Sequence, residues 1–332
     1  MGEFELIERF FQRPARQAAL GVGDDCALWP MRAGMQLAVS SDMLVEGRHF
    51  LSTVDPLRLG HKALAVNLSD LAACGAKPLA FTLALALPRV DAPWLQAFAN
   101  GLFALADQHG CELIGGDTTQ GPLNICITVL GEVPVVDGRS QALLRSGAQV
   151  GDDIHVSGSV GDARLALEQF RGRHSLPAAV FEQARARMEQ PTPRVALGLA
   201  LRGLATAAID VSDGLLGDLS HVLKASRVGA VIETELARPL LACAGSPAAE
   251  APGQWPLAPA QQLEYVLAGG DDYELVFTAP PSARAQVAAA AQAAATPVTR
   301  IGRITEAAPG LRLLDAAGQP VSGRFASFDH FA

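Results

Sequence analysis

Short apolar runs and longer amphipathic stretches take turns along the chain, a pattern typical of strands that alternate with helices. Strands are predicted at residues 37–39, 81–87, 111–114, 123–133, 154–157, 204–211 and 275–278. Helices are predicted at residues 3–11, 56–74, 92–109 and 283–295, from about 163 onward, and after Gly214 to about 226. This alternation indicates an α/β or α+β organisation.

A stretch rich in turn residues divides the chain. Residues 145–153 show no periodicity, so we expect a first domain over residues 1–146 and a second over residues 147–332. The length of 332 residues fits two domains of ~100–200 residues each. Residues 239–259 are rich in Ala and Pro and are interpreted as a surface excursion.

Charge and cysteine usage narrow the class of protein. The formal net charge of −8 makes non-specific nucleic-acid binding unexpected, and a polyanionic substrate would need cations as mediators. The five cysteines show no Cys-x-x-Cys spacing, which argues against zinc or a disulfide framework and favours a reducing, cytoplasmic compartment. The N-terminus does not resemble a signal peptide, and no apolar run approaches the ~20 residues of a membrane helix.

Hydroxyl and carboxylate side chains recur where apolar runs end. Ser40, Ser41 and Asp42 follow the run 37–39, which we expect to be a buried strand, and Ser212 and Asp213 follow the run 204–211. Strand ends of α/β folds are common ligand sites, and hard oxygen donors suit Mg²⁺. Each Ser-Asp pair alone is also typical of a simple turn cap. Several acids in one cleft would repel one another unless cations neutralised them, as in metal-bridged phosphate binding.

The usual nucleotide signatures are absent. The sequence has neither a Gly-x-x-x-x-Gly-Lys-Ser/Thr loop nor a Gly-x-Gly-x-x-Gly fingerprint. Gly115, Gly116 and Asp117 form an expected glycine turn that would let the backbone approach a phosphate while the carboxylate holds a counter-ion. His49 is either a phosphate contact or a structural residue. No nucleophile with an adjacent base stands out, which favours direct in-line transfer over a covalent intermediate.

Seven motifs, in the same order and across nearly the whole chain, resemble the thiamine-monophosphate kinase family. They are Gly-Asp-Asp-Cys-Ala at 23–27, Ser-Ser-Asp-Met at 40–43, the segment 67–78, Gly-Gly-Asp-Thr at 115–118, Arg-Ser-Gly-Ala at 145–148, Asp-Val-Ser-Asp-Gly-Leu at 210–215 and Gly-Gly-Asp-Asp-Tyr-Glu-Leu at 269–275. The wider group includes aminoimidazole ribonucleotide synthetase and selenophosphate synthetase. The resemblance implies their two-domain α/β (α+β) fold, in which each domain is a mixed sheet with packed helices.

The resemblance also implies an activity and a set of site residues. The activity is ATP-dependent phosphorylation of thiamine monophosphate to thiamine diphosphate. The first domain would bind ATP and Mg²⁺ and form a homodimer, and the second would complete the nucleotide and substrate site. The implied Mg²⁺ ligands are Asp25, Ser40, Ser41, Asp42, Asp70, Asp117, Asp210 and Asp213. The implied ATP contacts are Gly116, Asp117, Arg145 and Ser212, and the implied substrate contacts are His49, Asp271 and Phe328.

Two positions depart from the family pattern, and two other functions compete. Asp271 stands where the family often has Glu, and Phe328 where it often has Trp. A selenophosphate synthetase-like enzyme would need a reactive Cys and a nearby Lys in its N-terminal segment, and the first seventeen residues contain neither. A non-catalytic nucleotide- or metal-binding module would bind ATP without releasing ADP.

Overall fold

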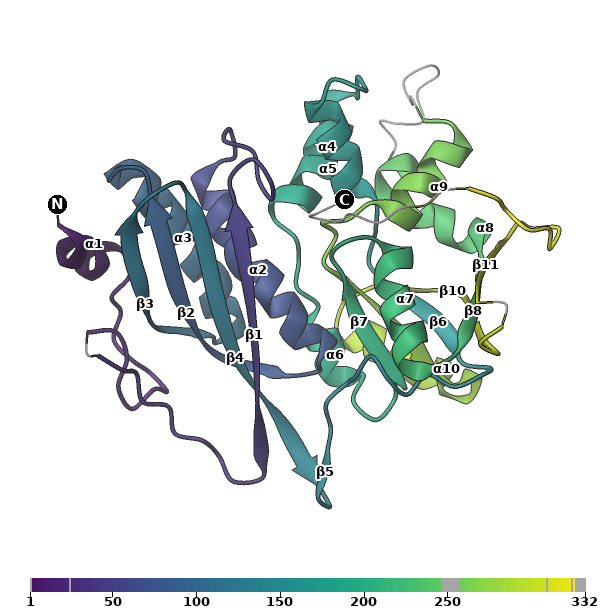
Figure 1. Ribbon diagram of the computed structural model, residues 1–332, viewed down its shortest axis with the longest axis horizontal. Coiled ribbons are helices and arrows are strands. Elements are labelled where there is room, and N and C mark those ends of the chain that lie inside the picture. The colour runs from purple at the N-terminus through teal and green to yellow at the C-terminus, as the bar shows by residue number, and fades with distance from the viewer. Residues whose placement is uncertain (1, 24, 247–256, 309, 324, 326–332) are drawn as a thin grey trace. The chain divides into compact units, whose positions relative to one another are not determined.

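The computed structural model describes residues 2–23, 25–246, 257–308, 310–323 and 325 (Figure 1). The chain forms two compact units, one of Met1–Leu71 with Ala76–Ala142 and one of Ala72–Gly75 with Leu143–Ala332. Each unit contains a mixed sheet and packed helices, which confirms the predicted fold class. Among the described residues, no helix is long and apolar enough to span a membrane.

The first unit contains a sheet with strand order β1-β4-β2-β3, in which β2 and β3 are parallel and the other pairs antiparallel. The strands are β1 (Met35–Val45), β2 (Lys77–Leu87), β3 (Glu112–Gln120) and β4 (Asn124–Val136), with the short β5 (Arg139–Ser140) beside β4. The helices are α1 (Glu3–Phe10), α2 (Pro56–Ala73) and α3 (Ala92–His109). Helices α2 and α3 cover one face of the sheet (Figure 1).

Strand β1 differs from its prediction in both length and burial. It continues through Ser40, Ser41 and Asp42 to Val45, because this whole segment pairs with β4. Leu37 and Val39 are 46% and 57% exposed, so the predicted buried strand is an edge strand with one open face. A strand at the edge of a sheet alternates its side chains between the two faces, and only one of these packs on α2.

The predicted glycine turn at residues 115–119 is also part of a strand. Residues 112–120 form β3, and Gly116 pairs with Leu83 of β2. A Cβ on Gly116 would lie 1.9 Å from the carbonyl oxygen of Leu83, and φ is +148° there. The close approach of β2 therefore explains this glycine, whereas a Cβ on Gly115 would meet nothing within 4 Å.

Helices α2 and α3 pack closely enough for their backbones to touch. A Cβ on Gly60 of α2 would lie 2.0 Å from the carbonyl oxygen of Phe98, and a Cβ on Gly101 of α3 would lie 1.8 Å from that of Leu57. Each glycine thus faces the main chain of the other helix. Trp94 stacks on Phe98 beside this contact, with ring centroids 5.1 Å apart.

The second unit contains a six-stranded sheet of order β11-β8-β10-β6-β9-β7, in which only β11 and β8 are parallel. Its strands are β6 (Asp153–Ser157), β7 (Ala207–Val211), β8 (Gly229–Glu233), β9 (Glu274–Ala279), β10 (Val298–Thr305) and β11 (Leu311–Leu314). Its helices are α4 (Asp162–Phe170), α5 (Ala178–Glu189), α6 (Val195–Ala200), α7 (Leu215–Ser226), α8 (Thr234–Ala237), α9 (Pro259–Ala268) and α10 (Arg284–Ala293). The main core lies between the sheet and α4, α5, α7, α8 and α9.

The predicted surface excursion at residues 239–259 is wrong for its first part. Arg238–Leu240 and Ala242–Gly245 form short 3₁₀ turns, and Leu240, Leu241 and Cys243 are buried in the core of the second unit. Alanine and proline content alone indicated a loop, but three apolar side chains within four residues favour burial. Residues 247–256 lie outside the described part of the chain.

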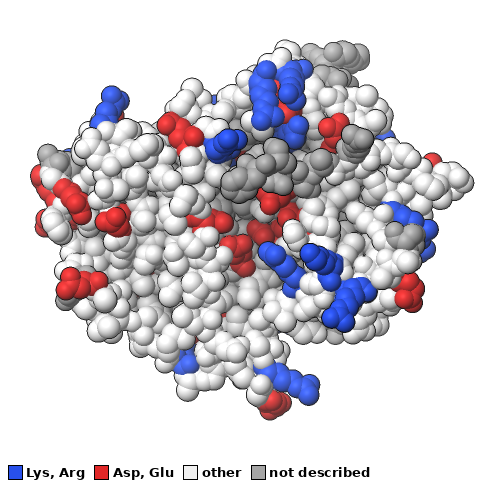
Figure 2. All heavy atoms as spheres, viewed as in Figure 1, with Lys and Arg blue, Asp and Glu red and all other residues white. Residues whose placement is uncertain are grey.

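Basic side chains gather over α4 and α5 (Figure 2). Three of them, Arg164, Arg171 and Arg173, form ion pairs with the fully buried carboxylate of Glu168. Three cations on one carboxylate leave this surface with an excess of positive charge in a chain whose formal net charge is −8. These ion pairs stabilise the C-terminal end of α4. Arg164 also lies over the ring of Tyr265 in α9.

Candidate active site

In the first unit, three candidate residues lie between β1 and α2. Ser40 donates a hydrogen bond from its hydroxyl to the carboxylate of Asp70. The backbone N–H of Asp42 donates to the side-chain oxygen of Asn67 at 3.0 Å, and the Asn67 amide donates to the Ala63 carbonyl. The i, i+3 spacing of Asn67 and Asp70 places both on one helix face, and their contacts to Asp42 and Ser40 show that this face lies toward β1. Two carboxylates and a hydroxyl therefore share one side of the sheet.

Ser41 belongs to the opposite side of the sheet. Its hydroxyl lies 3.0 Å from the Thr128 hydroxyl and donates to the carbonyl of Ile127. Neighbouring positions of a strand point to opposite faces, so the Ser41 side chain is turned away from Asp42 and Asp70. The structure thus brings Ser40, but not the Ser41 hydroxyl, to the acidic group.

His49 follows β1 in a tight turn. Its Nδ1 accepts the backbone N–H of Val45 at 3.0 Å, which fixes the neutral ring as the tautomer with its proton on Nε2. The buried Lys62 of α2 donates to the His49 carbonyl at 3.3 Å and so holds this turn to the helix. The sequence analysis missed Lys62, although a lysine at a buried helical position is an unusual signal.

The remaining candidates of the first unit lie at the surface. Asp25 and Gly116 are exposed, and so is Asp117 in β3. The loop that leads to Asp25 is held at Glu112, whose carboxylate accepts the backbone N–H groups of residues 16, 17 and 18. Asp24 lies outside the described residues.

In the second unit, β7 ends at Val211, directly before Ser212 as predicted, and α7 begins at Leu215 after a short turn. Asp210 is 6% exposed within the strand, and Ser212 and Asp213 occupy the turn. One oxygen of Asp218 accepts the backbone N–H groups of Ser212, Asp213 and Gly214 at 3.0, 3.1 and 3.1 Å. Burial raises the pKa of Asp218 to about 6. The sequence analysis did not select Asp218, although an acid in the first turn of a predicted helix is a recognisable signal.

Arg145 belongs to the second unit and lies in the segment that precedes β6 in the sequence. The hydroxyl of Ser226 donates to the Arg145 carbonyl and accepts the backbone N–H groups of Gly147 and Ala148, all at 3.1 Å. The side chain of Arg145 is exposed. Ser226 is a third residue that the sequence analysis missed, because its partner lies some eighty positions away in the sequence.

The two neighbouring acids of the Gly-Gly-Asp-Asp motif have different environments. Asp272 is buried, its carboxylate accepts the Gly161 N–H at 2.9 and 3.0 Å, and burial raises its pKa well above the usual range. Asp271 is half-buried with φ +71°, and its backbone N–H donates to the Ser212 carbonyl at 2.7 Å. Of the two, Asp271 is the one whose side chain is accessible, and it lies beside the Ser212 turn. Phe328 lies outside the described residues.

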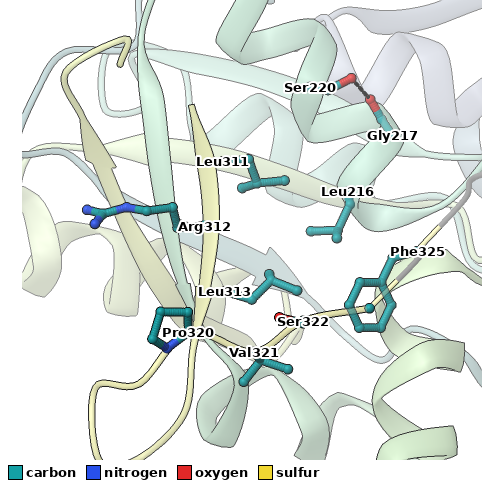
Figure 3. A pocket seen from close by; sticks show the side chains of 11 residues that line it. Leu216, Gly217, Ser220, Leu311, Arg312, Leu313, Pro320, Val321, Ser322 and Phe325 are labelled. Carbon is teal, nitrogen blue, oxygen red and sulfur yellow. Dashed lines mark hydrogen bonds between the residues drawn. The ribbon is translucent and has the colours of Figure 1, made fainter. Parts of the chain in front are cut away.

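A cavity of about 660 Å³ opens beside the start of α7. Apolar side chains of Leu216, Leu311, Leu313 and Phe325 line it, and Ser220 and Arg312 add polar groups (Figure 3). The cavity has the size of a small-molecule pocket, and its lining combines apolar and polar groups.

The candidate carboxylates are therefore distributed over both units: Asp25, Asp42, Asp70 and Asp117 in the first, and Asp210, Asp213 and Asp271 in the second. Within the described part of the chain, no three His, Cys, Asp or Glu side chains already form a group that could hold a metal ion. Ser40, Asp42 and Asp70 come nearest to a common donor set, with oxygen ligands of the kind that Mg²⁺ prefers.

Comparisons with known proteins agree on one family. Residues 23–133 match the N-terminal domain of AIR synthase related proteins, and residues 149–312 match their C-terminal domain. The thiamine-monophosphate kinase of Salmonella typhimurium is 43% identical over 340 residues, which cover 100% of this chain and 98% of that protein.

Solved structures give the same result. The crystal structure of thiamine-monophosphate kinase from Stenotrophomonas maltophilia K279a is 42% identical, with a TM-score of 0.81 and 96% coverage of both chains. The structure of AaThiL complexed with AMPPCP and TMP is 28% identical, with a TM-score of 0.73, and the alignment covers 91% of this chain and 89% of that one.

Proposed function

This chain belongs to the thiamine-monophosphate kinases of the AIR synthase related family, and we propose that it transfers the terminal phosphoryl group of ATP to thiamine monophosphate, forming thiamine diphosphate. The observation that carries this proposal is 43% identity along the full chain to a relative of that name. A related structure holds AMPPCP and TMP together, which supports the same pair of substrates here.

The acidic side chains are the reason to expect that the reaction requires Mg²⁺. Both substrates carry negatively charged phosphate groups, and the candidate site residues are mostly carboxylates, so cations would lie between them. The donors proposed are Ser40, Asp42 and Asp70 together with Asp25, Asp117, Asp210 and Asp213. The Ser41 hydroxyl is left out, because it faces the other side of the sheet. Bound Mg²⁺ would neutralise charge that develops on the transferred phosphoryl group.

The chain's own residues have separable tasks in this reaction. The Arg145 guanidinium, with the backbone at Gly116 and Ser212, would hold the phosphates of ATP. The Nε2–H of His49 would donate to the phosphate of thiamine monophosphate, because its Nδ1 is already occupied as an acceptor. The acceptor oxygen would then attack the γ-phosphorus in line, with no phosphorylated side chain as an intermediate. Labelled phosphate found on the quenched protein would contradict this route.

The cavity beside α7 is the proposed receptor for the rings of thiamine. Its apolar lining includes the aromatic Phe325, and α7 begins directly after the Ser212 turn to which Asp271 is also bound. Asp271 would contact the substrate from this turn. Phe328 would stack on a ring of thiamine, with a smaller contact area than a Trp would offer.

The decisive assay measures ADP release in the presence of Mg²⁺ with a panel of acceptors. Thiamine monophosphate should support release together with equimolar thiamine diphosphate, while unphosphorylated thiamine and selenide should not. ADP release with selenide alone would indicate a synthetase. Binding of ATP without acceptor-dependent release under any condition would indicate a non-catalytic module and overturn the proposal.

The open face of β1 supports a homodimer formed through the first unit. Leu37, Val39 and Met43 are 46%, 57% and 52% exposed on this face, with Ser41 among them. An apolar row on an edge strand is an association site, and a second copy offers an identical and complementary row. Sedimentation of Val39→Lys should show a monomer where wild type sediments as a dimer, and Val90→Lys, at another exposed valine of the same unit, should leave the dimer intact. A monomeric wild type would overturn the dimer.

All five cysteines are free thiols in the structure. From the cysteine usage of the sequence we propose that the enzyme works in a reducing, cytoplasmic compartment.

A further inference from the structure

Helix α7 contacts two separate segments of the second unit that carry proposed ATP and metal contacts. Near its start, Asp218 binds the turn of Ser212, Asp213 and Gly214. At its last residue, Ser226 binds the segment of residues 145–148. Neither of these two side chains is itself a candidate ligand of ATP or Mg²⁺.

The Asp218 contact replaces an ordinary helix cap. Gly214 is the N-cap residue of α7 and has no side chain to cap with. Instead, a single oxygen of Asp218, which is 4% exposed, takes all three N–H groups of the turn. Hydrogen bonds to an ionised acceptor are stronger than neutral ones. The backbone positions of Ser212 and Asp213 are therefore fixed relative to the helix.

The Ser226 contact uses the full bonding capacity of a hydroxyl. Its one hydrogen goes to the carbonyl of Arg145, and its two lone pairs receive the N–H groups of Gly147 and Ala148. The segment itself has no regular secondary structure, and Gly147 is exposed with φ +120°. This serine therefore helps to orient the backbone from which the Arg145 side chain projects, together with the Ala208 N–H, which donates to the Leu144 carbonyl.

We propose that α7 is a positioning element for the nucleotide: Asp218 and Ser226 set the spacing between the Ser212–Asp213 turn and Arg145. Eight helical residues separate the two side chains, which corresponds to ~12 Å along a rigid axis. A correct spacing would let both segments engage one ATP–Mg²⁺ complex at once. This inference rests on the proposed kinase function, since it assigns both segments to the nucleotide.

Ser226→Ala is the cleaner of two tests. It removes three hydrogen bonds, and because Arg145 and Gly147 are exposed while only Ala148 is buried, two of the three freed groups can turn to water and the fold should persist. We expect the Kd for AMPPCP with Mg²⁺, measured by calorimetry, to rise about tenfold, with the KM for thiamine monophosphate unchanged. The matched control is Thr234→Val, which removes a hydroxyl that also donates at 3.1 Å to a distant carbonyl, that of Leu314. The control should leave the Kd at its wild-type value.

Asp218→Asn tests the other end of the helix. An amide cannot present a charged oxygen to three donors, so we expect weaker AMPPCP binding and a higher Mg²⁺ concentration for half-maximal activity. Asp153→Asn is the control for burial, because Asp153 is also nearly buried and pairs with Arg284 away from the motifs. It should lower the Tm without changing the Mg²⁺ requirement.

Two results separate the possible failures. If Ser226→Ala and Asp218→Asn lower the Tm but bind AMPPCP like wild type, both residues are structural and the inference is wrong. If wild type binds AMPPCP but releases no ADP with thiamine monophosphate, the proposed kinase function fails, while the effect of both variants on AMPPCP binding still decides the role of α7.

Discussion

The Ser40 hydroxyl donates a hydrogen bond to the carboxylate of Asp70, which joins the middle of β1 to the last turn of α2. One oxygen of Asp70 is thereby oriented from the strand, and Asn67 holds the backbone of Asp42 one helical turn earlier. Strand and helix are linked through the same residues that are proposed to bind Mg²⁺. Substitutions here can therefore separate effects on the metal from effects on the fold.

Asp42→Asn should abolish most turnover and leave the fold intact. The backbone of Asp42 is held by Asn67 through its N–H, which the substitution keeps, while a charged metal ligand is lost. A loss of ~3–4 kcal/mol of transition-state stabilisation corresponds to roughly 100- to 1000-fold in kcat. Steady-state kinetics with Mg²⁺ and thermal unfolding measure the two effects. The control is Asp55→Asn, an exposed residue that accepts the Leu57 N–H near the start of α2. Wild-type turnover in Asp42→Asn would make Asp42 a structural residue only.

Asn67→Leu should destabilise the first unit. The side chain is 1% exposed, and its loss leaves the N–H of Asp42 without this acceptor. An unpaired buried donor costs about 1–3 kcal/mol. Chemical denaturation measures the change, and Asn100→Ala, at an exposed position in α3 that accepts from Gln96, should cost much less. Equal free energies of unfolding for wild type and Asn67→Leu would show that the Asn67 contact contributes nothing.

His155 should make stability fall as the solution becomes acidic. The ring is buried against Phe277 in the core of the second unit, and burial lowers its pKa from 6.5 to about 4. Above pH 6.5 the residue is neutral in both states and contributes no pH dependence. Between pH 6.5 and about 4 only the unfolded chain takes up the proton, so up to about 3 kcal/mol is lost at ~1.4 kcal/mol per pH unit.

Denaturation at pH 7, 5.5 and 4.5 tests this dependence. His155→Gln should flatten the loss in that window, whereas His221→Gln, at an exposed histidine of α7, should not. The lowered pKa of Asp153, which arises from its hydrogen bond to Arg284, adds a loss only at pH values below about 3.8. A slope that persists in His155→Gln would assign it to other groups.

Phe328→Ala should raise the KM for thiamine monophosphate about tenfold and leave the KM for ATP and the Tm nearly unchanged. Stacking contributes roughly 0.5–1.5 kcal/mol beyond area burial, and ~1.4 kcal/mol is a factor of ten. Phe328→Trp should bind the substrate as well as wild type or better. A drop of several degrees in Tm with an unchanged KM would instead make Phe328 a hydrophobic plug.

The sequence predicted the helices of the first unit and the end of β7 well, because these depend on local signals. Gly110 ends α3 in a left-handed conformation, and Ser212 follows a fully buried run. The sequence-based prediction for β1 was wrong about burial, because the run Leu-Ala-Val is equally compatible with a central strand and with an edge strand. Only the pairing with β4, more than eighty residues away, and the position of α2 decide which face is covered.

The same distinction explains the site. Asp42, Asp70 and Asp213 were selected from local motifs, and the structure places them beside polar partners. Asp218 and Ser226 escaped selection because their role consists of contacts to backbone, and Ser226 reaches a segment far away in sequence. A motif identifies groups that touch a ligand, whereas the residues that orient those groups become visible only with the fold.

The close approach of α2 and α3 at Gly60 and Gly101 limits how this enzyme can diverge or be engineered. A methyl group at either position would overlap the main chain of the opposite helix. Accommodating one would move α2 away from α3, and with α2 would go Asn67 and Asp70, whose partners lie on β1. A mutational library would therefore find almost no tolerated residue at these two sites, even though neither is a candidate site residue. A substitution at Gly60 or Gly101 would lower stability and activity together, because the same displacement of α2 would damage both.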